Sequence, residues 1–265
     1  MPGLLALEPR LIVFGLVLTR VSGMFLALPM LSGEVVPLRL RAAIACALGF
    51  ALSMAVHAPR VPAGAGEVVA AAAVELLVGA GLGLLVRLAL AVAEGLGAFV
   101  SMQMGLGFNA IVDPLTHAET PLASLFGLVA WVLLLACDGH HQVMRGLADS
   151  LRALPPGAIL AADSAPFAEP FAERVTDAGG ALFAAALRIA TPVVGALLGT
   201  NACLALLARV APKVNLLMLG FLIAAGAGLL ALALAGPSMA RGLSNHLTSA
   251  LAQMRGVAAE LATGR

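Results

Sequence analysis

Apolar residues of this chain come in long runs that short polar stretches separate. The runs are Leu11–Leu31, Leu40–Val56, Val68–Phe108, Leu122–Cys137, Ala178–Leu207 and Val214–Ala235. Most of them are close to the roughly 20 residues that a helix needs to cross the core of a bilayer. The pattern therefore predicts an all-α integral membrane protein built of long, kinked hydrophobic helices, with about six apolar segments.

The third run, Val68–Phe108, is too long for one simple span. As a helix it would measure about 61 Å, roughly twice the hydrocarbon thickness of about 30 Å. We therefore expect either two helices or one helix that leaves the membrane plane. Gly95 and Gly97 are the expected break point.

The last part of the chain, residues 238–261, is predicted to be an amphipathic C-terminal helix. Its apolar residues recur at helical spacing, at Met239, Leu243, Leu247, Leu251 and Met254. Such a face can dock on a partner or on the membrane surface. No soluble domain is evident, so residues 1–265 are interpreted as a single membrane-embedded domain.

Composition supports the membrane interpretation. Hydrophobic residues make up 61% of the chain and charged residues 11%, whereas soluble domains carry about 25% charged residues. The chain has ten Phe, one Trp and no Tyr, so the usual aromatic belts at the membrane surfaces are missing. That absence fits a subunit surrounded by other protein. The net charge of +1 gives no argument for nucleic acid.

Close helix packing is also predicted. Gly79 and Gly83 share a Gly-x-x-x-Gly spacing, and so do Gly195 and Gly199. This spacing lets helix backbones approach each other, either inside the protein or against a partner subunit.

Charged residues interrupt the apolar runs at Arg20, Glu75, Arg87, Glu94 and Arg188. Each would cost about 2.5–3.5 kcal/mol at a helix centre facing lipid, or about 12–18 kcal/mol together. That sum is as large as or larger than the usual net stability of about 5–15 kcal/mol. Most of them must therefore be paired, or face a wet cavity or another protein. The helical positions of Glu75, Arg87 and Glu94 do not bring them neatly together. Two interpretations stay open: a proton or ion relay, and a set of anchoring ion pairs to neighbouring helices.

The polar break at Ser101–Ser124 is either a plain surface loop or the working part of the protein. Within it, Gly105–Ala110 ("GLGFNA") formally fits a dinucleotide-binding Gly-x-Gly-x-x-Ala pattern. That site needs a preceding strand, a following helix and an acidic residue about 20 positions later. Here a membrane-type helix precedes the glycines and an Asp-Pro follows, so we reject a dinucleotide site.

The segment Asp138–His141 ("DGHH") places a carboxylate and two imidazoles just after an apolar run. A metal site usually needs a third or fourth ligand and supporting hydrogen bonds. We therefore interpret the segment as a polar helix end with Gly139 as a break, and expect no metal site. No catalytic grouping and no cofactor site stands out, so nothing argues for an enzyme.

Four sequence blocks carry a resemblance to a known family. They read "RVSGMFLALPMLSGEVVPLRLRAAIA", "MQMGLGFNAIVDP", "LLLACDGHHQVMRGLADSLRALPPG" and "LFAAALRIATPVVGALLGTNACLALLARVAPKVNLLMLGF". In this order they resemble the FliR family, flagellar biosynthetic proteins of the type III secretion export gate. Asp138–His141 favours the flagellar branch over the virulence branch. Lys213 and Val214 stand where flagellar members commonly have Gln-Met.

The resemblance implies a subunit of an export gate in the bacterial inner membrane, at the flagellar basal body. Its implied partners are FliP-type and FliQ-type subunits, other export-gate membrane proteins and unfolded flagellar proteins in transit. It also favours ion pairs with partner subunits for Glu75, Arg87, Glu94 and Arg188. The alternatives are a virulence-type secretion counterpart and a secondary transporter or ion channel with intramembrane charges on the ion path.

In such gates a loop between central helices acts as a plug, which by position is Gly105–Pro121 here. Its residues suit that role, because glycines free the backbone and Pro114 supplies a turn. The residues that the resemblance assigns to the plug and pore are Met102, Met104, Gly105, Gly107, Phe108, Asn109, Ile111, Asp113 and Pro114.

Overall fold

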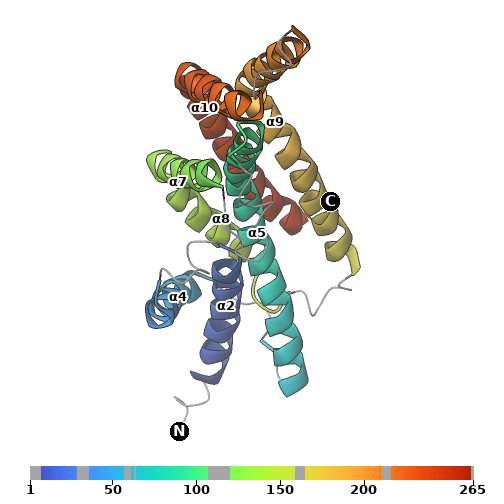
Figure 1. Ribbon diagram of the computed structural model, residues 1–265. Coiled ribbons are helices and arrows are strands. Elements are labelled where there is room, and N and C mark those ends of the chain that lie inside the picture. The colour runs from blue at the N-terminus through green and yellow to red at the C-terminus, as the bar shows by residue number, and fades with distance from the viewer. Residues whose placement is uncertain are drawn as a thin grey trace. The chain divides into compact units, whose positions relative to one another are not determined.

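The computed structural model describes residues 7–28, 36–56, 61–62, 64–106, 120–158, 165–210 and 216–263. Over these residues all regular structure is helical, which confirms the predicted fold class (Figure 1). The helices are α2 (Leu7–Ala27), α4 (Leu38–Ala55), α5 (Ala65–Gln103), α7 (Pro121–Ala136), α8 (Gly139–Ala153), α9 (Ala165–Val210) and α10 (Leu216–Thr263).

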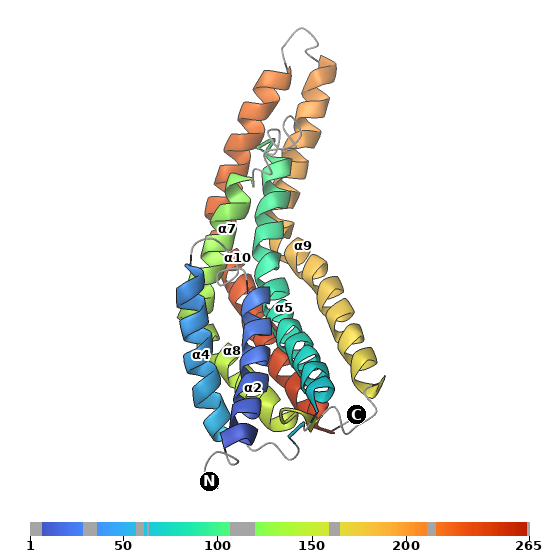
Figure 2. The same cartoon turned by 90° about the horizontal axis from the view of Figure 1, so that it is seen from below.

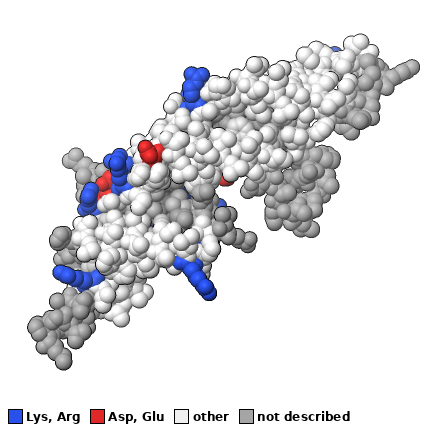
Figure 3. All heavy atoms as spheres, turned by 90° about the vertical axis from the view of Figure 1, so that its left-hand side faces the viewer, with Lys and Arg blue, Asp and Glu red and all other residues white. Residues whose placement is uncertain are grey.

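Five of these helices are long and apolar enough to cross a membrane, and the number rises to six if α7 and α8 together form one span. On the face drawn in Figure 3, charged side chains are sparse and most of the described surface is uncharged. A surface of this kind is suited to lipid or to the apolar helices of other membrane proteins.

Helix α5 is a single helix of 39 residues and runs without a break through Gly95 and Gly97. The predicted break at these glycines is therefore wrong. Gly97 serves close packing instead, because a Cβ atom there would lie 2.7 Å from the Cα atom of Ala123 at the start of α7. At about 1.5 Å per residue, α5 measures about 58 Å and exceeds the bilayer core.

Helix α10 has 48 residues and continues through Pro237, so residues 238–261 are the second part of a longer helix. The predicted apolar stripe of this part is buried, with exposed fractions of 1–3% from Met239 to Met254. The stripe therefore packs against this chain, which corrects the expectation that it docks on a partner or on the membrane surface.

The chain divides into two compact units. Unit 1 comprises residues 1–88, 138–179 and 249–265. In it α2 lies between α4 and the first part of α5 (Figure 2). The first Gly-x-x-x-Gly pair closes the seam between α2 and α5, because Gly79 faces the backbone of Arg20 and Gly83 faces the carbonyl of Met24.

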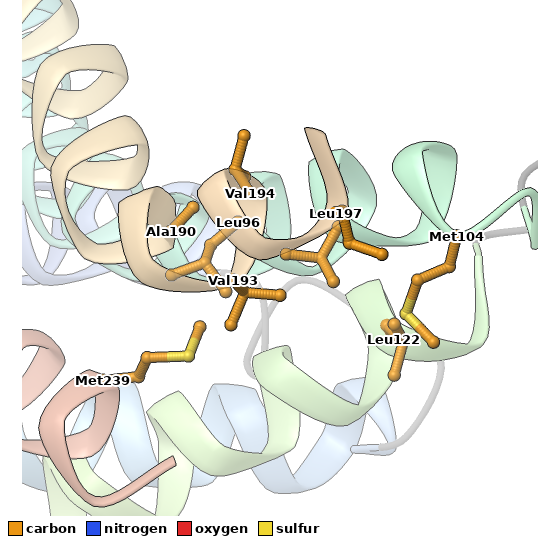
Figure 4. Packing of buried hydrophobic residues seen from close by; sticks show 9 residues of the cluster. Leu96, Met104, Leu122, Ala190, Val193, Val194, Leu197 and Met239 are labelled. Carbon is orange, nitrogen blue, oxygen red and sulfur yellow. The ribbon is translucent and has the colours of Figure 1, made fainter. Parts of the chain in front are cut away.

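Unit 2 comprises residues 89–137 and 180–248. Its core, which we call the unit 2 cluster, joins the end of α5 to α7, α9 and α10 (Figure 4). The buried members are Leu96, Val100, Met104, Leu122, Ala190, Val193, Val194, Leu197 and Met239. On α9 the buried residues occupy one face, whereas Gly195 and Gly199 are exposed. A Cβ atom added at either glycine would have no atom of the described residues within 4 Å.

Candidate functional site

The end of α5 is closed by a Schellman motif. Gly105 adopts the left-handed conformation with φ of 75°. Its N–H donates to the carbonyl of Met102 at 3.1 Å, and the N–H of Leu106 donates to the carbonyl of Ser101 at 2.9 Å. Leu106 then packs against the unit 2 cluster, which contains Val100. The two hydrogen bonds and this apolar contact are the features that stop a helix at a glycine.

The start of α7 lies at the same cluster. Thr120 is the N-cap residue of α7 in an extended conformation, and Pro121 opens the helix. Proline suits this place because its fixed φ matches a helix and its missing N–H is not needed there. The next residue, Leu122, is buried in the unit 2 cluster together with Met104 (Figure 4). Leu106 and Leu122, which are described residues on either side of segment 107–119, therefore lie at one hydrophobic core.

The two methionines before the loop occupy opposite environments. Met104 has an exposed fraction of 0%, whereas Met102 is 66% exposed. Met104 lies across Gly228 of α10, where a Cβ atom would come within 2.6 Å of the methionine sulfur. Gly105 faces the ring of Phe221 in the same helix, with 3.1 Å to an added Cβ atom. Met104 is thus a packing residue at the loop's base, and Met102 is available at the surface of the chain.

The remaining predicted plug residues, Gly107, Phe108, Asn109, Ile111, Asp113 and Pro114, lie outside the described residues.

A buried ion pair stands at the centre of unit 1. The Nε of Arg20 in α2 lies 2.5 Å from Oε2 of Glu75 in α5. Arg20 and Glu75 are 0% and 1% exposed. Glu75 therefore pairs with a neighbouring helix of this chain, which is one of the two interpretations left open from the sequence. The pairing of Glu75 with a partner subunit, which the resemblance favoured, is wrong because its counter-ion belongs to this chain. Burying either charge alone would be strongly unfavourable, and the ion pair offsets the cost of burying both.

The same guanidinium closes the C-terminal end of α8. Its two terminal nitrogens donate to the carbonyls of Ser150 and Leu154, each at 2.9 Å. Glu75 completes the network, since its Oε1 accepts the N–H of Gly157 at 3.3 Å. Gly157 has φ of 79°, a conformation that glycine adopts easily. We call these five residues the Arg20 network. It ties α2, α5, α8 and the following turn together.

The other predicted intramembrane charges are exposed in this chain. Neither Arg87 nor Arg188 forms an ion pair with another residue of the described ranges. Glu94 lies with its side chain over Gly127 of α7, where an added Cβ atom would be 3.2 Å from Glu94 Cγ. Ion pairs between these three residues and partner subunits stay a prediction.

Asp138 and the two histidines after it lie where the chain turns into α8. The break falls at Cys137–Asp138, just before the predicted position, because Gly139 is already the first residue of α8. Asp138 has φ of 54°, and its Oδ1 lies 3.5 Å from Nδ1 of His141. The ligand atoms of Asp138, His140 and His141 all lie within 4.8 Å of one another. These are the residues of the described chain that could hold a metal ion.

Comparison with known proteins points to one family. Residues 11–250 match the family described as bacterial export proteins, family 1. The flagellar biosynthetic protein FliR of Escherichia coli (strain K12) is 31% identical over 205 residues, which cover 77% of this chain and 76% of that protein. FliR of Bacillus subtilis (strain 168) is 26% identical over 78% of this chain and 79% of its own length. FliR of Aquifex aeolicus (strain VF5) is 27% identical over 90% of this chain and 91% of its own length.

Proposed function

Because the chain belongs to the FliR family of bacterial flagellar export proteins, we propose that it forms part of the channel for unfolded flagellar proteins and that Gly105–Pro121 plugs that channel. The family assignment makes the chain a membrane subunit of the flagellar export apparatus, located in the inner membrane at the flagellar basal body. This family is a non-enzymatic component of the apparatus, so its action depends on shape and on movement.

The observation that carries the plug assignment is the common anchor of the loop. The Schellman motif at Gly105 fixes its first end, and Leu122 fixes its second end in the unit 2 cluster. A plug needs such a base, because its tip must move aside while the surrounding helices stay packed. Loops that open are drawn from the less stable parts of a structure, and cores from the more stable parts.

For partners, we infer FliP-type and FliQ-type subunits. Helix α9 supports this, because in its candidate span Phe183–Val210 only 17% of an apolar 18-residue stretch is buried in the chain. The exposed face carries Gly195 and Gly199, and small residues let a second helix approach closely in a membrane. The missing aromatic belts agree with a chain covered by other protein.

The alternative of a secondary transporter has less support. An ion path would use the titratable group of Glu75, but this carboxylate is buried against Arg20 and also accepts the N–H of Gly157. A carboxylate held in this way serves packing. The relatives reported above are named for flagellar biosynthesis, which favours the flagellar apparatus over a virulence-type one.

The test is a deletion of residues 107–113 in the full gate. We expect the complex to assemble with its other subunits but to let small ions cross the membrane, as measured by dye-reported ion flux into vesicles. The matched control is Arg241→Ala, a change on an exposed part of α10, which should keep the vesicles tight. If the deleted gate assembles and ion flux stays at the level of the intact gate, the plug assignment fails.

A further inference from the structure

Asp138, His140 and His141 form the group of metal-ligand type in the described part of the chain. The three side chains come from the first turn of α8 and the residue before it. Asp138 Oδ1 and His141 Nδ1 are 3.5 Å apart, and the rings of His140 and His141 have centroids 4.1 Å apart. All three side chains are exposed at the surface of this chain, so no other described residue covers them.

The backbone at Asp138 departs from that of an ordinary helix start. An aspartate at this position usually has an extended backbone and accepts a hydrogen bond from an amide of the first turn. Asp138 has the left-handed conformation and makes no such capping bond. It is the one non-glycine residue with positive φ among the described residues. The carboxylate faces the imidazole of His141 instead, so helix capping does not account for this aspartate.

We propose that Asp138, His140 and His141 form a surface site for a divalent transition-metal ion such as Zn²⁺, Ni²⁺ or Co²⁺. Two imidazole nitrogens and one carboxylate oxygen suit ions of this class, whereas Ca²⁺ and Mg²⁺ prefer oxygen ligands alone. A bound cation would also balance the carboxylate and hold the two neighbouring rings in one arrangement.

The geometry needs only a small adjustment. Ligands at about 2.0–2.1 Å from a tetrahedral ion lie about 3.4 Å apart. The Asp138–His141 separation of 3.5 Å already meets this value, and the third ligand atom lies within 4.8 Å of the others. Exposed side chains can close that gap by rotation about their own bonds. Three protein ligands leave at least one position for water or for a donor from another molecule.

The experiment uses the full-length purified chain, carried in detergent without a polyhistidine tag and stripped of metal. Co²⁺ is titrated in, and its visible absorption and the stoichiometry are recorded; Zn²⁺ is then added to displace it. The variants are Asp138→Asn, His140→Ala and His141→Ala. The matched control is His57→Ala, which removes a histidine far from this group in the sequence. Circular dichroism checks that each variant keeps its helices.

We expect one Co²⁺ per chain in the unaltered protein and in the His57→Ala control. Each of the three cluster variants should bind at least about tenfold more weakly, since losing a group that only supports a ligand already costs about 10–100-fold. Cu²⁺ paramagnetic resonance should show two nitrogen ligands in the unaltered chain and one after His141→Ala. No Co²⁺ binding, or binding that the three variants leave unchanged, overturns the proposal.

Discussion

Removing the guanidinium of Arg20 should destabilise unit 1 more than any loss of an exposed charge. In Arg20→Met the carboxylate of Glu75, which is 1% exposed, stays buried without a counter-ion. Breaking a buried ion pair from one side costs about 3–5 kcal/mol. The change also removes the donor to the carbonyls of Ser150 and Leu154. The Ser150 carbonyl keeps the N–H of Leu154, so the cost of about 1–3 kcal/mol for an orphaned acceptor applies to the Leu154 carbonyl alone.

The expected loss for Arg20→Met is therefore about 4–8 kcal/mol, which approaches the whole stability of a typical domain of about 5–15 kcal/mol. Removing both charges in Arg20→Met/Glu75→Leu should cost clearly less than the sum of the two single changes. A coupling energy of about 2–3 kcal/mol is expected for residues in direct contact. The matched control is Arg87→Met, because Arg87 is exposed and such changes cost about 0.5 kcal/mol or less.

The assay is equilibrium unfolding of the purified full-length chain in mixed micelles titrated with sodium dodecyl sulfate, followed by circular dichroism. Glu75→Gln provides a milder variant that keeps an acceptor for Gly157 in case Arg20→Met does not fold. The reasoning is refuted if Arg20→Met unfolds at the same detergent fraction as Arg87→Met, or if the double change costs the full sum.

Two further predictions use the same unfolding assay. Gly83→Leu should lower the free energy of unfolding by about 3 kcal/mol, because the new side chain would meet the Met24 carbonyl. Gly195→Leu points into open space and should raise the free energy of unfolding by about 0.5–1 kcal/mol through helix propensity. Equal effects of the two variants would contradict the α2–α5 seam. Met104→Ala should lower the free energy of unfolding by about 2–5 kcal/mol and Met102→Ala by less than about 0.5 kcal/mol. The reason is that the exposed fractions of Met104 and Met102 are 0% and 66%. A Met102 variant as unstable as the Met104 variant would be evidence against a buried Met104 and an exposed Met102.

The helical membrane fold could be predicted because apolar runs report directly on burial and length. The run from Val68 shows the limit of that signal. Gly95 and Gly97 were expected to break it, but a glycine in a helix can mark either a bend or a close contact, and only the neighbouring helix decides. The second part of α10 shows the same limit. The apolar stripe from Met239 onward predicts burial, but the sequence does not identify the surface that covers it.

For the candidate-site residues, too, the sequence predicted only part of what the structure shows. Arg20 and Glu75 were recognised as costly charges, but their pairing was missed because 55 residues separate them. A usable signal was present, since Glu75 precedes Gly79 by one helical turn and so lies on the face where close packing was expected. Residue type alone could not distinguish Met102 from Met104. Two positions along a helix point to nearly opposite sides, so one of the two side chains is buried and the other exposed.

The Arg20 network also has a consequence for how the chain is made. Ribosomes add about 5–20 residues per second, and Ser150 follows Arg20 by 130 residues, so roughly 6–26 s pass before α8 can be capped. Glu75 follows by 55 residues, which is roughly 3–11 s. Helix α2 is therefore synthesised before the carboxylate that pairs with Arg20. Until α5 arrives, an unpaired Arg20 at a helix centre would cost about 2.5–3.5 kcal/mol in lipid, so we expect the Arg20–Glu75 pair to favour entry of α2 and α5 into the membrane together.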